Sequence, residues 1–259
     1  MESENPVYPA LSISKIKNPN RYWAIPILGG VAKIIILVPV FVEIAVLIFY
    51  VFLLQIVNSF YVLTSRKYWQ YCFDTTCATL TLITKTAFFF AGLSDKYPGF
   101  DLKSNGDFDL KFTYPASPGA FYAIPVLGGL ARGIILIPFA IYAQVISNGA
   151  RVGLVASSVP VFLNGRYPDS TFELIRDSLR LSLSEMAYFA GISDHYPSFK
   201  ISMNSQTIKI FLIIIGTILL ISQWKWHGWG TRRDDYFKNQ KPYMQNFPKN
   251  YPPSYQNYH

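Results

Sequence analysis

Three residue types that hydrolases use in catalysis, Ser193, Asp194 and His195, stand next to one another in the second half of the chain. A catalytic triad is assembled from residues far apart in sequence, because its side chains must converge on one point. Immediate neighbours point in different directions. We therefore predict no catalysis here but a turn that ends a helix, with Asp194 capping that turn or pairing with a base.

The remaining reactive residues show no pattern of a metal, cofactor or disulfide site. Cys72 and Cys77 lie five residues apart on an expected helix, so their side chains diverge. The three histidines, at positions 195, 227 and 259, have no ligand spacing. The glycine pairs at 29–30 and 128–129 lack the lysine of a phosphate loop and indicate close helix packing or a kink. We expect no cofactor and no metal.

The segments that hold these residues are strongly apolar. Of 259 residues, 51% are hydrophobic and 15% are charged, whereas about a quarter of a soluble domain is charged. Residues 34–64 contain one charge, Glu43, and this run exceeds the roughly 20 residues that cross a bilayer. The sequence predicts a mainly α-helical integral protein of the cell membrane. It excludes a soluble enzyme, a disordered chain and a disulfide-stapled secreted domain.

The net charge of +8 is concentrated at the C-terminal end. Residues 224–259 contain six basic and two acidic side chains, which supply half of the net charge. A basic segment beside an apolar one attracts anionic lipid headgroups or sets topology. We therefore predict the lipid bilayer, including anionic lipids, as a partner, and no nucleic acid.

The chain repeats itself with a period of 99 residues and no gap. AIPILGG at 24–30 returns as AIPVLGG at 123–129, identical at six of seven positions, and AGLSDKYPGF at 91–100 returns as AGISDHYPSF at 190–199, identical at seven of ten. This self-similarity predicts a tandem duplication. The expected domains are a first membrane repeat (1–104), a second membrane repeat (105–206), a C-terminal transmembrane helix (207–229) and a disordered basic tail rich in Tyr, Asn and Pro (230–259).

The order of these motifs resembles a bacterial and archaeal membrane family known only as a domain of unknown function, DUF four-three-eight-nine, in which two copies per chain are common. The second repeat matches best, because NGRYP at 164–168 is similar to the family's TGRYP and SDHYPSF at 193–199 to its TDxYPPF. The first repeat departs from the pattern, since SRKYW at 65–69 lacks the glycine and the proline. The resemblance covers about residues 7–203 and implies a membrane location but no activity.

Short strands are expected before the helices. Residues 11–16 and 108–112 alternate apolar and polar side chains. Asn105-Gly106, between 100–103 and 108–112, is the signal for a tight hairpin, because both central residues of that turn need positive φ. We predict a small sheet beside the membrane.

The apolar runs at 34–64 and 134–163 are too long for a straight span, since 31 helical residues measure about 46 Å and the hydrocarbon core about 30 Å. Two alternatives remain: a tilted or kinked span, or a helical hairpin that wedges into the membrane. The sequence SNGAR at 147–151 favours a break in the second run. Direct repeats favour the hairpin, because an odd number of crossings per repeat would put the two linkers on opposite faces.

Two intramembrane charges lie in these runs, Glu43 and Arg151. A charge left unpaired in the hydrocarbon is costly. The two could form a bridge that locks the repeats together, reach the interface near a bend, or line a polar pathway. We favour a structural role, because a pathway needs more than one polar pair.

An amphipathic helix follows each apolar run and is clearest in the second repeat. Apolar residues recur there at spacings of three and four, Ser170-x-x-Glu173 indicates its start, and Gly191 its end. Its charged face excludes a span. We expect this helix to lie in the membrane interface with its apolar side down, or to pack on the protein's own apolar bundle.

A basic residue and an aspartate, 28 residues apart, bracket this helix in both repeats. We predict two structural pairs, Arg166 with Asp194 and Lys67 with Asp95, each closing the helix against its flanking turns.

Taken together, these features predict a non-catalytic multi-pass membrane protein, not an enzyme: a scaffold, or an accessory subunit of a membrane complex that has a protein partner or a second copy of itself. The alternative is a small transporter or channel built from repeats. A water-filled cavity lined by Glu43, Arg151, Asn58 or Gln144 would indicate transport. A third class, a lipid-modifying enzyme, requires an interfacial cleft with at least two convergent titratable groups.

Overall fold

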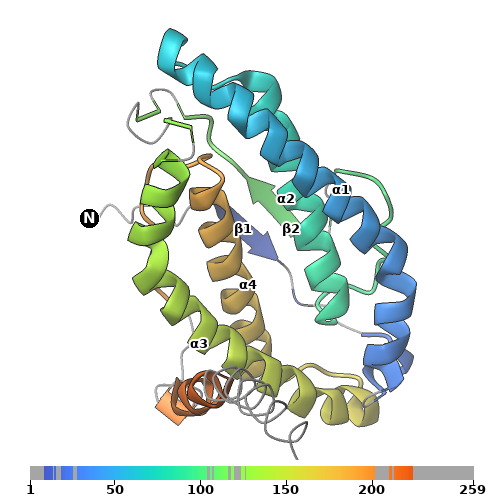
Figure 1. Ribbon diagram of the computed structural model, residues 1–259. Coiled ribbons are helices and arrows are strands. Elements are labelled where there is room, and N and C mark those ends of the chain that lie inside the picture. The colour runs from blue at the N-terminus through green and yellow to red at the C-terminus, as the bar shows by residue number, and fades with distance from the viewer. Residues whose placement is uncertain are drawn as a thin grey trace, which may run out of the picture. The chain divides into compact units, whose positions relative to one another are not determined.

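The computed structural model describes residues 9–13, 15, 19–25, 28–103, 106, 108–115, 118–119, 124–125, 127–201, 210–211 and 213–223. The chain forms two units, residues 1–216 and 217–259. The first unit is mainly helical and holds every predicted site residue (Figure 1). Its elements are β1 (Ala10–Ile13), the 3-10 helix η1 (Arg21–Ala24), α1 (Leu28–Ser65), α2 (Gln70–Phe90), β2 (Phe108–Lys111), α3 (Leu127–Asn164) and α4 (Asp169–Phe189).

The two apolar runs form single continuous helices. α1 and α3 contain 38 residues each and are long and apolar enough to cross a membrane. The helical-hairpin alternative is therefore wrong. Residues 148–150 lie within α3 and are buried, and the Ser147 hydroxyl bonds to the Ser178 hydroxyl of α4 at 3.0 Å. The small side chains predicted to break this helix instead allow α4 to approach it.

Each long helix forms an antiparallel pair with the shorter helix that follows it. Lys33, near the start of α1, donates to the carbonyl of Phe90 at the end of α2. Arg132, near the start of α3, donates in the same way to the carbonyl of Tyr188 in the last turn of α4. Both shorter helices end in a turn at a glycine with positive φ, Gly92 and Gly191, as predicted for Gly191.

The two strands pair with each other across a long stretch of sequence. β1 and β2 are antiparallel, with Leu11 opposite Leu110, and lie between α2 and α4 (Figure 1). The hairpin predicted between 100–103 and 108–112 does not form. Asp101 is held elsewhere, because its carbonyl accepts from Lys85 of α2 at 2.5 Å and its carboxylate accepts from the Lys103 amide at 3.0 Å.

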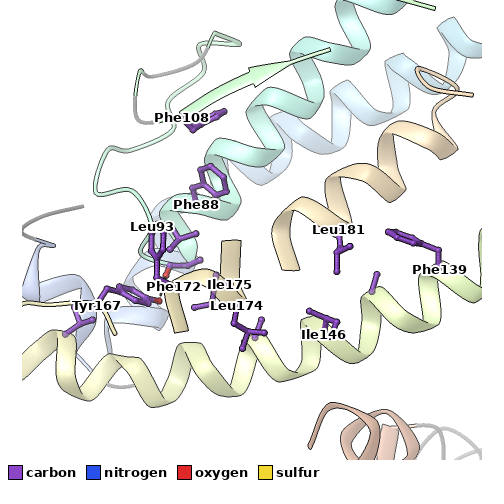
Figure 2. Packing of buried hydrophobic residues seen from close by; sticks show 14 of the residues in the cluster. Phe88, Leu93, Phe108, Phe139, Ile146, Tyr167, Phe172, Leu174, Ile175 and Leu181 are labelled. Atoms are coloured by element: carbon purple, nitrogen blue, oxygen red, sulfur yellow. Dashed lines mark hydrogen bonds between the residues drawn. The ribbon is translucent and has the colours of Figure 1, made fainter. Parts of the chain in front are cut away.

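The core lies between the helices and the strands. Figure 2 shows Phe108 of β2 near Phe88 of α2, while Tyr167, Phe172 and Ile175 gather where α4 begins. The apolar side of α4 is thus covered by the protein itself, as the bundle alternative expects, and the location of this helix in the membrane interface stays a prediction. α4 begins at Asp169 without a side-chain cap, so Ser170 is not its cap.

Only part of the predicted C-terminal span falls within the described residues. Ile213–Gln223 is an apolar helix, and residues 207–209, 212 and 224–229 lie outside the description. The predicted tail, 230–259, also lies outside it.

Candidate functional site

A buried arginine organises the end of α4. Arg132 of α3 is 6% exposed and donates to three oxygens: the carbonyls of Tyr188 and Ser193, at 2.8 and 3.2 Å, and Oδ1 of Asp194, at 2.6 Å. Carbonyls at a helix C-terminus carry partial negative charge, so a cation stabilises them. Asp194 is therefore the counter-ion of Arg132 and belongs to the turn that ends the helix.

Lys33, which lies 99 residues before Arg132, has a similar set of contacts. Lys33 is buried, donates to the Phe90 carbonyl at 3.3 Å and interacts electrostatically with Asp95. Its ammonium group also lies 5.6 Å from the centre of the Phe89 ring. A lysine has no planar fork, so it contacts fewer oxygens than Arg132 does.

One carboxylate oxygen of Asp95, and one of Asp194, accepts a hydrogen bond from a backbone amide elsewhere in the chain. Asp95 Oδ2 accepts from the Asn20 amide at 2.8 Å, and Asp194 Oδ2 accepts from the Gly119 amide at 3.0 Å. Asn20 and Gly119 are again 99 residues apart. Each aspartate therefore joins the segment before a long helix to the turn after a short one.

The predicted pair of Arg166 with Asp194 is wrong, because Asp194 bonds to Arg132. Arg166 precedes α4 and Asp194 follows it, and the 21 residues of α4 extend about 30 Å as a helix. α2 separates Lys67 from Asp95 by the same length, and Asp95 faces Lys33, so that pair is wrong for the same reason.

Two buried tyrosines tie the predicted repeats to each other. The Tyr68 hydroxyl donates to the carbonyl of Ala190 at 3.4 Å, and Tyr167 donates to the carbonyl of Ala91 at 3.1 Å. Burial raises the pKa of both phenols, so they stay protonated donors. Sequence reasoning missed this role, although both tyrosines recur at the period of 99 within the motifs that carry the repeat.

The two charges predicted to lie within the membrane, Glu43 and Arg151, do not meet. Arg151 is exposed and bonds to Asn148 of its own helix at 3.2 Å. Glu43 is half-buried, and one of its oxygens is buried without a hydrogen-bond partner in the described part of the chain. It interacts electrostatically with Lys85 of α2, whose pKa is lowered by burial. The bridge between Glu43 and Arg151 is therefore wrong.

The side chains of Ser193 and Asp194 bond to different groups. The Ser193 hydroxyl accepts from the backbone amide of His195 at 3.1 Å, and Asp194 bonds to Arg132. The thiols of Cys72 and Cys77 are free. Burial raises the pKa of Cys72 and, helped by Asp74, raises that of Cys77 to about 12. Ser193 and Asp194 thus stabilise the turn that follows α4.

No family model matches the chain, and no curated protein and no solved structure matches it. The resemblance to the family of unknown function therefore stays a prediction.

Proposed function

We propose that this chain is a non-catalytic, multi-pass protein of the cell membrane, a scaffold or accessory subunit, built from two structural repeats. The observation that carries the proposal is the outer face of α1. Only 11% of its most apolar stretch is buried, and large apolar side chains such as Val46 and Phe49 are exposed along it. An apolar surface of this extent needs a cover, and a bilayer covers a long helix on all its outer sides.

The charges of the shorter helices α2 and α4 are compatible with membrane insertion. α4 carries charges, but its Asp177 is fully buried and lies 3.3 Å from Arg176 and 3.9 Å from Arg180. Charged groups within a membrane protein are expected to pair inside the bundle and away from lipid. α1 and α3 would then span the bilayer and face the lipid, while α2 and α4 pack against their inner sides.

The pairing between positions 99 residues apart supports two repeats related by an approximate two-fold axis. Leu11 pairs with its own counterpart Leu110 in the ribbon of β1 and β2. The two tyrosine contacts are reciprocal, because Tyr68 and Tyr167 are counterparts, as are Ala190 and Ala91. This is the pattern of an isologous dimer, here within one chain. A fused symmetric bundle suits a rigid scaffold.

The chemistry of the buried polar groups also supports a scaffold. Arg132, Asp194 and Lys33 each bond to helix ends or to backbone segments, so these groups are engaged within the fold. A catalytic group needs free capacity aimed at a substrate.

The test is a charge placed on the lipid-facing surface. Val46→Lys should move the chain from the membrane pellet to the soluble or aggregated fraction after alkaline carbonate extraction. Phe100→Lys is the matched control, because Phe100 is 60% exposed and Val46 63%, but Phe100 lies in the segment after α2. Wild type and Phe100→Lys should stay in the pellet. Extraction of the wild type by carbonate would overturn the proposal.

The alternative, a small transporter or channel, draws support from the same two-fold relation, because many transporters are built from related repeats. Sealed liposomes that contain the purified chain separate the two functions. A scaffold leaves the permeability to protons and small ions unchanged, whereas a flux that the Glu43→Gln variant abolishes would favour transport.

A further inference from the structure

At the turn after α3, an arginine from a distant part of the sequence lies against the residue that precedes Arg166. Arg21 of η1 lies against Gly165, since a Cβ atom at Gly165 would be 3.0 Å from Nε of Arg21 and 3.0 Å from one of its terminal nitrogens. Arg166 is the next residue in the chain, and both arginines are exposed. The described residues provide neither of them with an acidic partner or a hydrogen bond.

The acidic group nearest in sequence does not neutralise them. Asp169 follows this turn and forms an ion pair with Lys15. Asp95, which fastens Asn20 beside Arg21, is already opposed by Lys33. Within the described part of the chain, the turn therefore presents two positive charges that are available for an anion.

The surroundings of Arg166 are amphipathic. Arg166 lines a shallow hollow together with Asn164 and the rings of Pro160, Tyr167 and Pro168. The neighbouring Leu163 of α3 is 63% exposed, and Tyr22, next to Arg21, is 79% exposed. A cationic and amide-lined hollow beside exposed apolar side chains suits a ligand with an anionic head and an apolar tail.

We propose that Arg21 and Arg166 form a binding site for the phosphate of an anionic phospholipid. The planar fork of a guanidinium binds phosphate oxygens in a bidentate way. The site lies at the end of an apolar helix, where headgroups would lie if α3 crosses the bilayer. This inference rests on the proposed membrane function and adds a specific lipid to it.

The equivalent turn of the first repeat provides the control. Lys67 is the counterpart of Arg166, but the counterpart of Arg21 is Ala120, which carries no charge. That turn has a second cation of its own, Arg66, but none from the other repeat, so it carries the same number of charges without the facing arginine. If the two arginines form a specific site, substitution of Arg166 should weaken lipid binding and substitution of Lys67 should not. If binding reflects only diffuse positive charge, both substitutions should weaken it equally.

The experiment is a titration of the purified full chain in non-ionic detergent with dioleoylphosphatidylglycerol, followed by native mass spectrometry. The wild type should retain this lipid in preference to dioleoylphosphatidylcholine. Arg21→Ala and Arg166→Ala should each weaken retention about tenfold, the usual loss for one charge-assisted bidentate contact. Arg166→Lys should also weaken it, because charge alone does not replace the fork. Lys67→Ala should change it less than twofold.

Three outcomes would overturn the site. Equal losses in Lys67→Ala and Arg166→Ala would mean diffuse attraction, and full retention in Arg166→Lys would mean that charge alone suffices. Complete displacement of the lipid by inorganic phosphate, at constant ionic strength, would mean that the site takes a free anion. Carbonate extraction keeps this test separate from the proposed function: the variants should remain in the membrane pellet, and a soluble wild type would refute the function instead.

Discussion

Arg66 is held in a backbone conformation that suits glycine. Its φ is 58°, and its counterpart Gly165 has φ 64°, so both turns have the same left-handed residue after the long helix. The first predicted repeat therefore keeps the turn although it lacks the glycine of the motif. A side chain in this region costs roughly 1–2 kcal/mol. Arg66→Gly should raise the free energy of unfolding by about 1 kcal/mol, measured by denaturant titration in mixed micelles.

The reverse substitution is the control. Gly165→Ala should lower stability by about 1 kcal/mol, because it adds the same strain and pushes against Arg21. Destabilisation by Arg66→Gly would show that the Arg66 side chain makes contacts worth more than its strain.

Asp194 should contribute far more than an exposed acid to stability. It shares a buried guanidinium with two carbonyls, so Asp194→Asn leaves the charge of Arg132 poorly compensated and should cost about 2 kcal/mol. Asp169→Asn removes an ion pair whose carboxylate is 86% exposed and should cost about 0.5 kcal/mol or less. Thermal unfolding monitored by circular dichroism compares the two variants. Equal costs would contradict the role given to Arg132.

The thiol of Cys77 should react slowly in the folded protein. Its pKa is raised from 9.0 to about 12 by burial first and by Asp74 second, so at pH 8 it has about a thousandfold less thiolate than the unfolded thiol. Iodoacetamide should therefore modify Cys77 about a thousandfold more slowly in the fold, in a Cys72→Ala background. Asp74→Asn should speed the reaction, and a rate equal to that in denaturant would refute the burial of this group.

The raised pKa of Cys77 also makes the stability of the fold depend on pH. Between pH 9 and about 12 the unfolded thiol has lost its proton while the folded thiol keeps it, so the contribution of Cys77 to stability falls as the pH rises.

Among the elements, the start of α1 depends on one glycine of its pair. A Cβ atom at Gly29 would lie 2.5 Å from the carbonyl oxygen of Trp23, whereas one at Gly30 would meet nothing within 4 Å. Gly29→Ala should therefore displace η1 and cost roughly 1–3 kcal/mol, and Gly30→Ala should be neutral or slightly stabilising. Unfolding midpoints of both variants in one detergent check this. Similar effects of the two would show that η1 does not pack as closely as described.

The elements were largely predictable, and their partners were not. Hydrophobic runs and period-3.6 patterns predicted α1, α3 and α4, because the spacing of apolar residues within a single segment is enough to indicate a helix. The strands were predicted from alternation, but β2 was assigned to a hairpin because the local Asn-Gly signal says nothing of β1, almost a hundred residues away. Arg166 was matched with Asp194 because both flank α4, while the direction of α3 beside α4 selects Arg132.

At the scale of the first unit, the contacts between the predicted repeats fix the directions of the long helices. Arg21, before α1, lies against Gly165, after α3. Gln55, in the second half of α1, donates to Ala190, in the turn that Arg132 of α3 organises. The start of α1 is thus near the end of α3, and the two helices run in opposite directions. Neither composition nor period contains this information, because it depends on how one repeat faces the other.

These opposite directions predict opposite sidedness for the two equivalent turns. Ser65 ends α1 and Asn164 ends α3, and both are exposed. In a background with Cys72→Ala and Cys77→Ala, Ser65→Cys and Asn164→Cys should be labelled by an impermeant maleimide from opposite sides of sealed, uniformly oriented membrane vesicles. The single-cysteine variants control each other, and detergent should make both fully reactive. Labelling of both from one side would mean that α1 and α3 lie along the surface, and the multi-pass proposal would fail even if carbonate left the chain in the membrane.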